Sequence, residues 1–232
     1  MTPRAPQKLA HGSNRCEQCT TRQRCIVSCL SAEQFAALQP QIVERVIPVG
    51  REIETQGARP DTVRIVKLGL FKGTRLTARG ERRAVCLQGK GRIVGLSGLY
   101  RQPASLSVVA ITPARVCEVP IDVIDDLGAT DRNFRRCLYK ALARYIDNLA
   151  DWSRILREEG IATQLCQALH LISLEEGHKA FRIPSHVELG RVLGARRETV
   201  ARHIGALIER GHFTKIDRWH GMLTTASDGT CA

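Results

Sequence analysis

The 232-residue sequence lacks a long uninterrupted apolar run, although apolar residues make up 43% of it. Its longest apolar stretches fall far short of the roughly 18 residues that a membrane-spanning helix needs, so we expect no membrane contact. No charged-then-apolar leader opens the chain, which favours a cytoplasmic protein over a secreted one. The nine cysteines are too sparse for a disulfide scaffold.

The sequence also lacks the motifs of common catalytic folds. It has no G-x-x-x-x-G-K-[ST] loop, no convincing dinucleotide-binding glycine pattern and no H-E-x-x-H motif. No nucleophile–base–orienter set and no pair of catalytic carboxylates stands out. We therefore expect a protein that is not an enzyme.

What the sequence does have is positive charge, with 35 Lys and Arg against 23 Asp and Glu and a formal net charge of +12. Such a balance favours a polyanionic partner, most simply nucleic acid. Most of the excess lies in a basic patch within residues 64–101, which would face DNA flanking a binding site, RNA polymerase or only solvent. The patch consists of Arg64, Lys67, Lys72, Arg75, Arg79, Arg82, Arg83, Lys90, Arg92 and Arg101.

The pattern along the chain predicts four parts. Residues 1–30 form a polar arm and a cysteine-rich loop, and residues 31–128 alternate short β-branched runs with glycine turns. Residues 129–159 predict a long helix, and residues 160–232 predict further helices and a wing that turns around Gly221. The expected fold is α+β: an antiparallel, jelly-roll-like β-roll, a long dimerisation helix and a winged helix-turn-helix. The predicted strands are residues 42–47, 62–68, 84–88, 92–96, 105–111 and 114–119.

The long helix carries one apolar stripe, with steps of three or four residues throughout. A helix of roughly 27 residues would be about 40 Å long, more than a small domain needs to cover its own core. The stripe therefore favours pairing of two copies, and packing on its own chain is the alternative. It consists of Phe134, Leu138, Leu142, Tyr145, Leu149, Trp152 and Leu156.

Residues 184–211 meet the requirements of a helix-turn-helix. Gly190 would allow close helix contact, Gly194 would permit the sharp turn, and Val200, Ile204 and Leu207 would bury one face of the second helix. The candidate DNA contacts are Ser185, His186, Arg196, Arg197, Glu198 and Arg202.

Cysteines crowd near the start of the chain. The spacing Cys16-x2-Cys19-x5-Cys25 places three thiols on a short loop, which can wrap one face of an iron–sulfur cubane. Zinc is the alternative metal, although zinc fingers usually show two close pairs of ligands. The candidates for a fourth ligand are Cys29, Cys86 and Cys117.

The other cysteines predict different roles. Cys86, Cys137 and Cys166 lie in apolar-periodic segments and are expected as small core residues, while Cys231 lies in the tail. A reducing cytosol disfavours a disulfide pair.

A β-roll, a long pairing helix and a winged helix-turn-helix together resemble the Crp/Fnr family of bacterial transcription regulators. Arg197-Glu198-Thr199-Val200-Ala201-Arg202 is similar to the R-E-T-V-x-R recognition helix of the cyclic-AMP receptor branch. Glu198 and Arg202 also match the E-x-x-S-R motif of the oxygen-sensing branch, which has serine where this chain has Ala201. The resemblance implies a homodimer that binds a palindromic operator in double-stranded DNA and works with RNA polymerase. Arg197 and Arg202 would read guanines, and Glu198 a cytosine.

The cysteines resemble those of the oxygen-sensing branch. Val116-Cys117-Glu118-Val119-Pro120 is similar to that branch's V-C-E-[IV]-P motif, which carries the fourth ligand. The resemblance implies a [4Fe–4S] cluster on Cys16, Cys19, Cys25 and Cys117. Its loss in oxygen would weaken the dimer and its DNA binding, and nitric oxide would attack the same cluster.

A regulator that binds a cyclic nucleotide or haem is the nearest rival. The nucleotide-binding branch needs a glutamate for the ribose and an arginine for the phosphate, where this chain has Leu96 and Ala104. An unpaired phosphate inside the roll would be costly. His11 and the cysteines could ligate haem, but their spacing does not select them.

Overall fold

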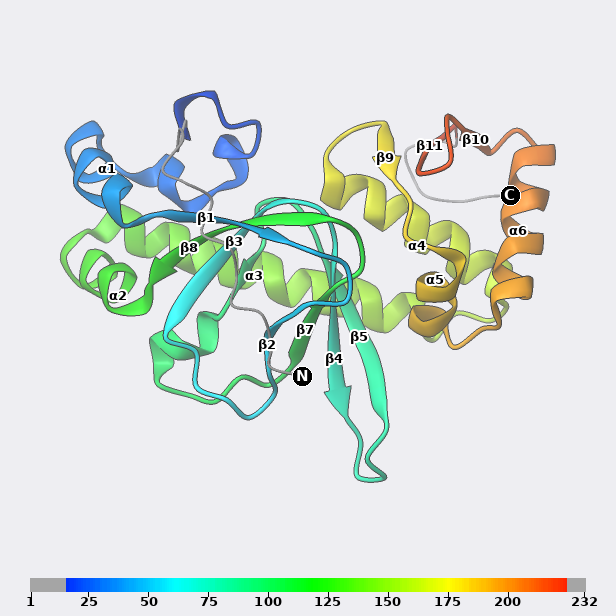
Figure 1. The fold of residues 1–232 in the computed structure, drawn as a ribbon, viewed down its shortest axis with the longest axis horizontal. Helices are drawn as coiled ribbons and strands as arrows, with labels where there is room; N and C mark the ends of the chain where they lie inside the picture. The colour runs from blue at the N-terminus through cyan, green and yellow to red at the C-terminus, as the bar shows by residue number, and fades with distance from the viewer. Residues whose placement is uncertain (1–15, 225–232) are drawn as a thin grey trace.

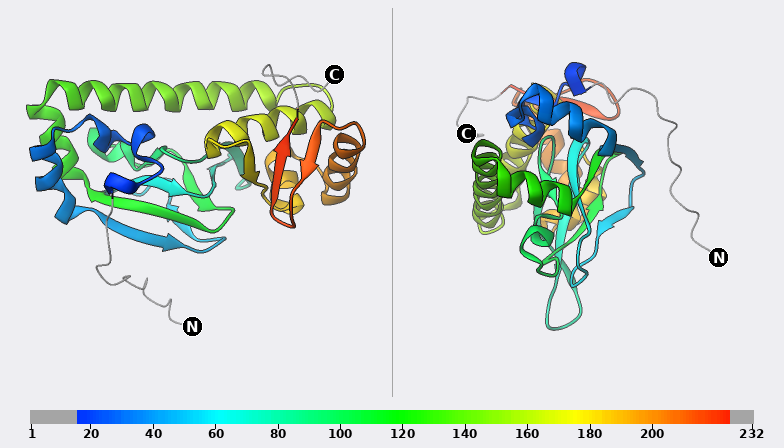
Figure 2. Two further views of the ribbon diagram at one scale, coloured as in Figure 1. Left: turned by 90° about the horizontal axis from the view of Figure 1, so that it is seen from above. Right: turned by 90° about the vertical axis from the view of Figure 1, so that its left-hand side faces the viewer.

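The computed structural model describes residues 16–224, in which a β-roll and a C-terminal unit lie along one long helix (Figures 1 and 2). Two four-stranded antiparallel sheets build the roll, in the orders β1–β8–β3–β6 and β2–β7–β4–β5. Within the described residues, no helix is long and apolar enough to cross a membrane. The roll strands are β1 (Val43–Ile47), β2 (Glu52–Glu54), β3 (Thr62–Leu68), β4 (Phe71–Leu76), β5 (Arg82–Gln88), β6 (Ile93–Val94), β7 (Ser107–Ala110) and β8 (Ala114–Pro120).

The predicted strands are all present, but β2 and β4 were not predicted. Two of the three residues of β2 are glutamates. In β4, a glycine stands at a position where an apolar residue would have completed the alternating apolar–polar pattern of a strand. A Cβ at that position, Gly73, would lie 2.8 Å from the Cys86 sulfur of the neighbouring strand. Close pairing of β4 with β5 therefore needs a glycine, which hides the strand from a pattern search.

Short helices cover one end of the roll. Ser31 forms the predicted capping box with Gln34 at the start of α1, and Asp131 caps α3 through the backbone N–H groups of Asn133 and Phe134. Helix α2, which precedes α3, was not predicted as a separate element. These elements are η1 (Cys16–Gln18), η2 (Arg22–Arg24), η3 (Ile26–Cys29), α1 (Ala32–Leu38), η4 (Gln39–Gln41), η5 (Leu96–Tyr100), α2 (Ile121–Thr130) and α3 (Arg132–Ile155).

Helix α3 corrects part of the predicted pairing stripe. Phe134 and Trp152 are 0% exposed and pack into the core of their own chain, so neither side chain is available to a second copy. Four of the other stripe residues, Leu138, Tyr145, Leu149 and Leu156, are half-buried against the core, and Leu142 is half-buried. The opposite face exposes Tyr139 and Ile146, at 58% and 57%. The stripe was predicted from spacing alone, which cannot tell a core-facing side from a partner-facing side.

The C-terminal unit is a winged helix-turn-helix. Gly194 adopts the left-handed conformation (φ 68°) at the predicted turn, and a Cβ at Gly190 would lie 2.5 Å from the Ala195 carbonyl oxygen. The wing turns at residues 216–219 rather than around Gly221, which sits in β11 against the Phe213 ring. The elements are α4 (Ile161–Glu176), β9 (Ala180–Arg182), α5 (His186–Leu193), α6 (Arg197–Glu209), β10 (Phe213–Lys215) and β11 (His220–Leu223), with sheet order β10–β11–β9.

Candidate metal centre and nucleic-acid interface

The cysteine-rich loop is fastened to the roll. The Thr21 hydroxyl, only 2% exposed, donates a hydrogen bond to the Lys67 carbonyl oxygen of β3 (2.8 Å). Ile26 and Val27 of η3 are buried in the same core as the ends of β3 and β8. The Arg22 guanidinium lies over the Phe35 ring of α1 at 4.9 Å. These contacts set the position of the loop, which appears in dark blue in Figure 1.

The four predicted cluster ligands come from two segments distant in sequence. Cys16, Cys19 and Cys25 lie on the loop, and Cys117 lies in the middle of β8, paired with β1 on one side and β3 on the other. Cys16, Cys25 and Cys117 all pack against the same apolar core.

Electrostatics shows that these thiols are neighbours. Burial, with a smaller contribution from the Cys16 and Cys19 thiols, raises the pKa of Cys25 to about 11, although the Val27 backbone N–H lowers it in part. Burial raises the pKa of Cys117 to about 12, with Cys25 as its strongest like-charge neighbour. Each thiolate would thus repel the others in a partly buried space, an arrangement that a bound cation would relieve.

The donor set fits an iron–sulfur cluster in its chemistry. Thiolates are the usual ligands of such clusters, and four cysteines suffice. Among residues 16–224, however, no three His, Cys, Asp or Glu side chains already stand in a metal-holding arrangement. Binding would therefore have to draw the loop sulfurs towards Cys117.

Cys29 and Cys137 correct the expectation that this chain forms no disulfide. Cys29, at the end of η3, is joined to Cys137 of α3. Cys137 is therefore not a spare core residue, and Cys29 has no thiolate to offer as the fourth ligand. The expected reducing cytosol disfavoured a disulfide, whereas the packing of η3 against α3 brings these two side chains together. Cys86 is a free, buried cysteine as predicted, whereas Cys166 is buried but disulfide-bonded, which was not predicted.

The loop also contacts the C-terminal unit. The Arg24 guanidinium donates to the Leu174 carbonyl oxygen at the end of α4 (2.8 Å). Next to it, the 4%-exposed Glu175 carboxylate accepts hydrogen bonds from the Gly89 backbone N–H (2.9 Å), Arg92 (2.9 Å) and Asn148 (3.2 Å). The roll, α3 and α4 meet at this one carboxylate.

The candidate DNA contacts lie in the N-terminal parts of α5 and α6, and all but the half-buried His186 are exposed. Arg197, Glu198 and Arg202 are exposed on the N-terminal half of α6, and Arg196 precedes them in an extended conformation. Ser185 accepts a hydrogen bond from the Glu188 backbone N–H and caps α5. Val200, Ile204 and Leu207 are buried as predicted, so the polar half of α6 points outward.

Sequence reasoning did not single out the basic side chains of the wing, one of which lies beside the candidate DNA contacts. Burial lowers the pKa of His186, and the neighbouring charges of Lys215 and Arg197 lower it further, which places Lys215 beside the start of α5. At the wing turn, Arg218 lies over the exposed Trp219 ring at 4.8 Å. The signal in the sequence was a tryptophan among basic residues within a predicted hairpin.

The basic patch carries less free charge than its composition suggests. Six of its ten members form ion pairs with glutamates, so most of their charge is locally neutralised. One of these pairs, Lys72 to Glu188 at 2.6 Å, joins β4 of the roll to α5. The paired members are Arg64, Lys67, Lys72, Arg82, Arg83 and Arg92.

His11 and Cys231 lie outside the described residues. Residues 95–108, which correspond to the segment that would hold a cyclic nucleotide, form η5, a connecting loop and the start of β7. Leu96 and Ala104 stand there as read from the sequence, and Ala104 is only 3% exposed.

Comparisons with known proteins agree with this architecture. Residues 44–131 match the family model described as a cyclic nucleotide-binding domain. The transcriptional activator protein Anr of Pseudomonas protegens is 29% identical over 208 residues, which cover 85% of this chain and 84% of that protein. The fumarate and nitrate reduction regulatory protein of Vibrio cholerae is 22% identical over 198 residues, covering 82% of this chain and 79% of that protein.

A solved structure shows the same fold. FixK2 from Bradyrhizobium japonicum superposes with a TM-score of 0.68 at 20% sequence identity. The match covers 79% of this chain and 93% of FixK2. The roll, the long helix and the helix-turn-helix are therefore a shared arrangement.

Proposed function

Because the chain belongs to the Crp/Fnr family of transcription regulators, we propose that it is a homodimeric, oxygen-responsive DNA-binding regulator with a [4Fe–4S] cluster. The observation that supports this proposal is that Cys16 and Cys25 of the loop and Cys117 of β8 pack against one apolar core. When bound, the cluster supplies an oxygen-labile centre that holds the loop against the roll. Cys16, Cys19, Cys25 and Cys117 are the proposed ligands.

A change in the conformation of the cysteine-rich loop would reach the C-terminal unit through Arg24. The same ten-residue stretch that carries the three loop cysteines, residues 16–25, holds the end of α4 through the Arg24–Leu174 hydrogen bond. Movement of the loop changes that contact, and α4 is part of the unit that carries α6. The ordered loop then favours the DNA-binding arrangement, which is a shift of population between two states.

Specific DNA contacts are assigned to α6. Arginine can donate paired hydrogen bonds to guanine, and glutamate can accept from the cytosine amino group, so Arg197, Glu198 and Arg202 suit base reading. Lys215 and Arg218 on the wing suit phosphate contacts, which fix orientation but carry no sequence information.

The dimer is assigned to the outward face of α3. Tyr139, Ala143, Ile146 and Ala150 are exposed and follow steps of four, three and four residues, the spacing of a helix-pairing seam. Small alanines between larger apolar side chains let two helices approach closely. A homodimer of this kind would present two α6 helices to a palindromic operator.

The test is anaerobic purification followed by exposure to air. We expect a broad visible absorption that air bleaches, together with a loss of operator binding. Cys117→Ala should abolish the absorption, whereas the matched change Cys86→Ala at a buried cysteine outside the site should keep it. A colourless protein that holds stoichiometric zinc would reject the oxygen-sensing function and favour a structural zinc site.

A further inference from the structure

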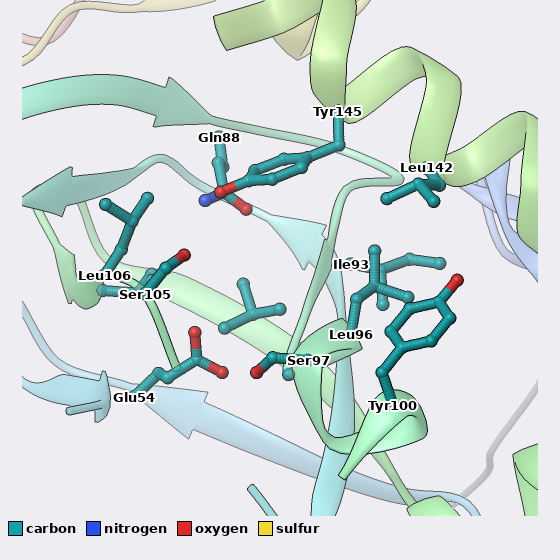
Figure 3. Close-up of a pocket in the computed structure, with 13 residues that line it drawn as sticks. Glu54, Gln88, Ile93, Leu96, Ser97, Tyr100, Ser105, Leu106, Leu142 and Tyr145 are labelled. Atoms are coloured by element: carbon teal, nitrogen blue, oxygen red, sulfur yellow. The ribbon is translucent and has the colours of Figure 1, made fainter. Parts of the chain in front are cut away.

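The roll encloses a cavity that belongs neither to the cysteine site nor to the DNA-binding face. Its volume is about 190 Å³, and β2, β5, β6, η5, β7 and α3 contribute to its wall (Figure 3). An engineered apolar cavity of about 150 Å³ is large enough to hold benzene, so this one can hold a slightly larger molecule. Ile93, Leu96, Leu106 and Leu142 give it apolar sides.

Two buried acceptor atoms in this wall have no hydrogen-bond partner. The Glu54 Oε2 atom and the Gln88 Oε1 atom are both inaccessible and unpartnered. Gln88 is 2% exposed, and in Figure 3 both side chains point into the cavity. Buried acceptors without donors are destabilising, so the wall is suited to a molecule that brings N–H groups.

The charge of the wall selects against anions. Among the thirteen lining residues, Glu54 is the only acidic side chain, and there is no Lys, Arg or His. Arg64 of β3, whose charge acts on Glu54 from outside the lining, already pairs with Glu118 at 3.0 Å. A phosphate placed here would meet a carboxylate and no counter-charge.

We propose that this cavity binds a small organic cation with several N–H donors, of the amidinium or guanidinium class. The cation would pair with Glu54 and donate to Gln88, while the Tyr100 and Tyr145 rings would flank it. Because Tyr145 and Leu142 belong to α3, the bound cation would contact the proposed dimerisation helix directly. This inference does not depend on the iron–sulfur cluster.

The test uses three probes of nearly the same shape and different charge. Benzamidine is cationic, benzamide is neutral and benzoate is anionic, and cyclic AMP serves as the nucleotide probe. Isothermal titration of the full-length protein should show benzamidine binding at least tenfold tighter than benzamide, with no binding of benzoate or cyclic AMP. Equal affinity for the three aromatic probes, no binding of benzamidine, or a preference for either anion would overturn the proposal.

A matched pair of variants locates the binding. Glu54→Gln should weaken benzamidine binding at least tenfold, whereas Glu52→Gln on the same strand, whose carboxylate pairs with Arg82, should leave it unchanged. Equal effects of the two variants would place the probe elsewhere. The probe series on the unmodified protein keeps the test decisive even if Glu54→Gln fails to fold.

Affinity for benzamidine should also depend on pH. Burial raises the pKa of Glu54 to about 7, while Arg64 and the Gly95 backbone N–H lower it, and the Tyr145 hydroxyl of α3 faces the same carboxyl. The ionised fraction of Glu54 therefore rises about tenfold between pH 6 and pH 8. Benzamidine affinity should rise by a similar factor in the unmodified protein and stay constant in Glu54→Gln. A constant affinity in the unmodified protein would overturn the assignment to Glu54.

Discussion

At the scale of single residues, Arg202 is the sharpest DNA-binding prediction. It is exposed on the half of α6 that leaves the core, and its neighbours Ile204 and Val200 hold the helix in place. Arg202→Ala should weaken binding to the operator by about 1–3 kcal/mol and relax the base preference at one position. Fluorescence anisotropy with an operator selected from random duplexes measures both effects.

The control for this prediction is Arg210→Ala, at an exposed arginine just after α6. We expect it to reduce affinity for specific and random DNA by a similar, smaller amount. If Arg202→Ala behaves in the same way, Arg202 contacts a phosphate and does not read a base.

Glu54 should make the protein less stable as the pH rises from 5 to 8. Its pKa of about 7 in the fold lies above the value of about 4.3 in an unfolded chain. In this window the folded protein keeps a proton that the unfolded chain has lost, so the free energy of unfolding falls as the pH rises. Urea unfolding of Glu54→Gln should lack this part of the slope, because an amide does not titrate. A slope identical to that of the unmodified protein would contradict the prediction.

At the scale of elements, the Cys29–Cys137 disulfide ties the cysteine-rich loop to α3. The bond closes a separation of 108 residues, and cross-links of this kind stabilise a fold mainly by restricting the unfolded chain. Cys137→Ser should lower the free energy of unfolding by about 2–4 kcal/mol under non-reducing conditions. In dithiothreitol the variant and the parent should be equally stable; a loss that persists there would arise from packing instead.

Helix α3 has two faces with different expected roles. Its core-facing side holds Phe134 and Trp152, and its outward side exposes Ile146. Ile146→Glu should convert the dimer to monomers, because two opposed carboxylates would replace an apolar contact. Sedimentation velocity measures the change.

Leu174→Glu, at a similarly exposed leucine on α4, is the control for Ile146→Glu and should leave the dimer intact. If Ile146→Glu has no effect while Leu142→Glu disrupts an otherwise folded dimer, the originally predicted stripe would be the pairing face.

At the scale of the whole molecule, Glu175 couples the roll, α3 and the C-terminal unit. Removing one partner of a buried charged network leaves the other groups unpaired, so Glu175→Gln should destabilise the protein by about 3 kcal/mol. The neighbouring change Glu176→Gln should be nearly neutral, since one Glu176 oxygen is already without a partner. Denaturant unfolding compares the two variants. An equal decrease in the free energy of unfolding for both would contradict the proposed coupling by Glu175.

Much of the local structure could be predicted because neighbouring residues decide it. Ser31 and Ser185 cap their helices, Gly194 makes the turn, and the alternation of β3 and β8 marks them as strands. Strand β4 and the wing turn escaped prediction because Gly73 and Gly221 serve close packing with distant residues. Spacing found the candidate ligands, but it gave no sign of the Cys29–Cys137 bond.

The sequence by itself determined the order of the elements, the recognition helix and the three-cysteine loop, since each depends on residues within a few positions of one another. Only the tertiary structure decided which face of α3 is free, which cysteines meet and where the positive charge is neutralised. Those properties depend on contacts between residues tens to more than a hundred positions apart, such as Arg24 with Leu174 and Arg92 with Glu175. Folding creates these contacts by burying apolar surface, and no local pattern records which distant side chains that burial brings together.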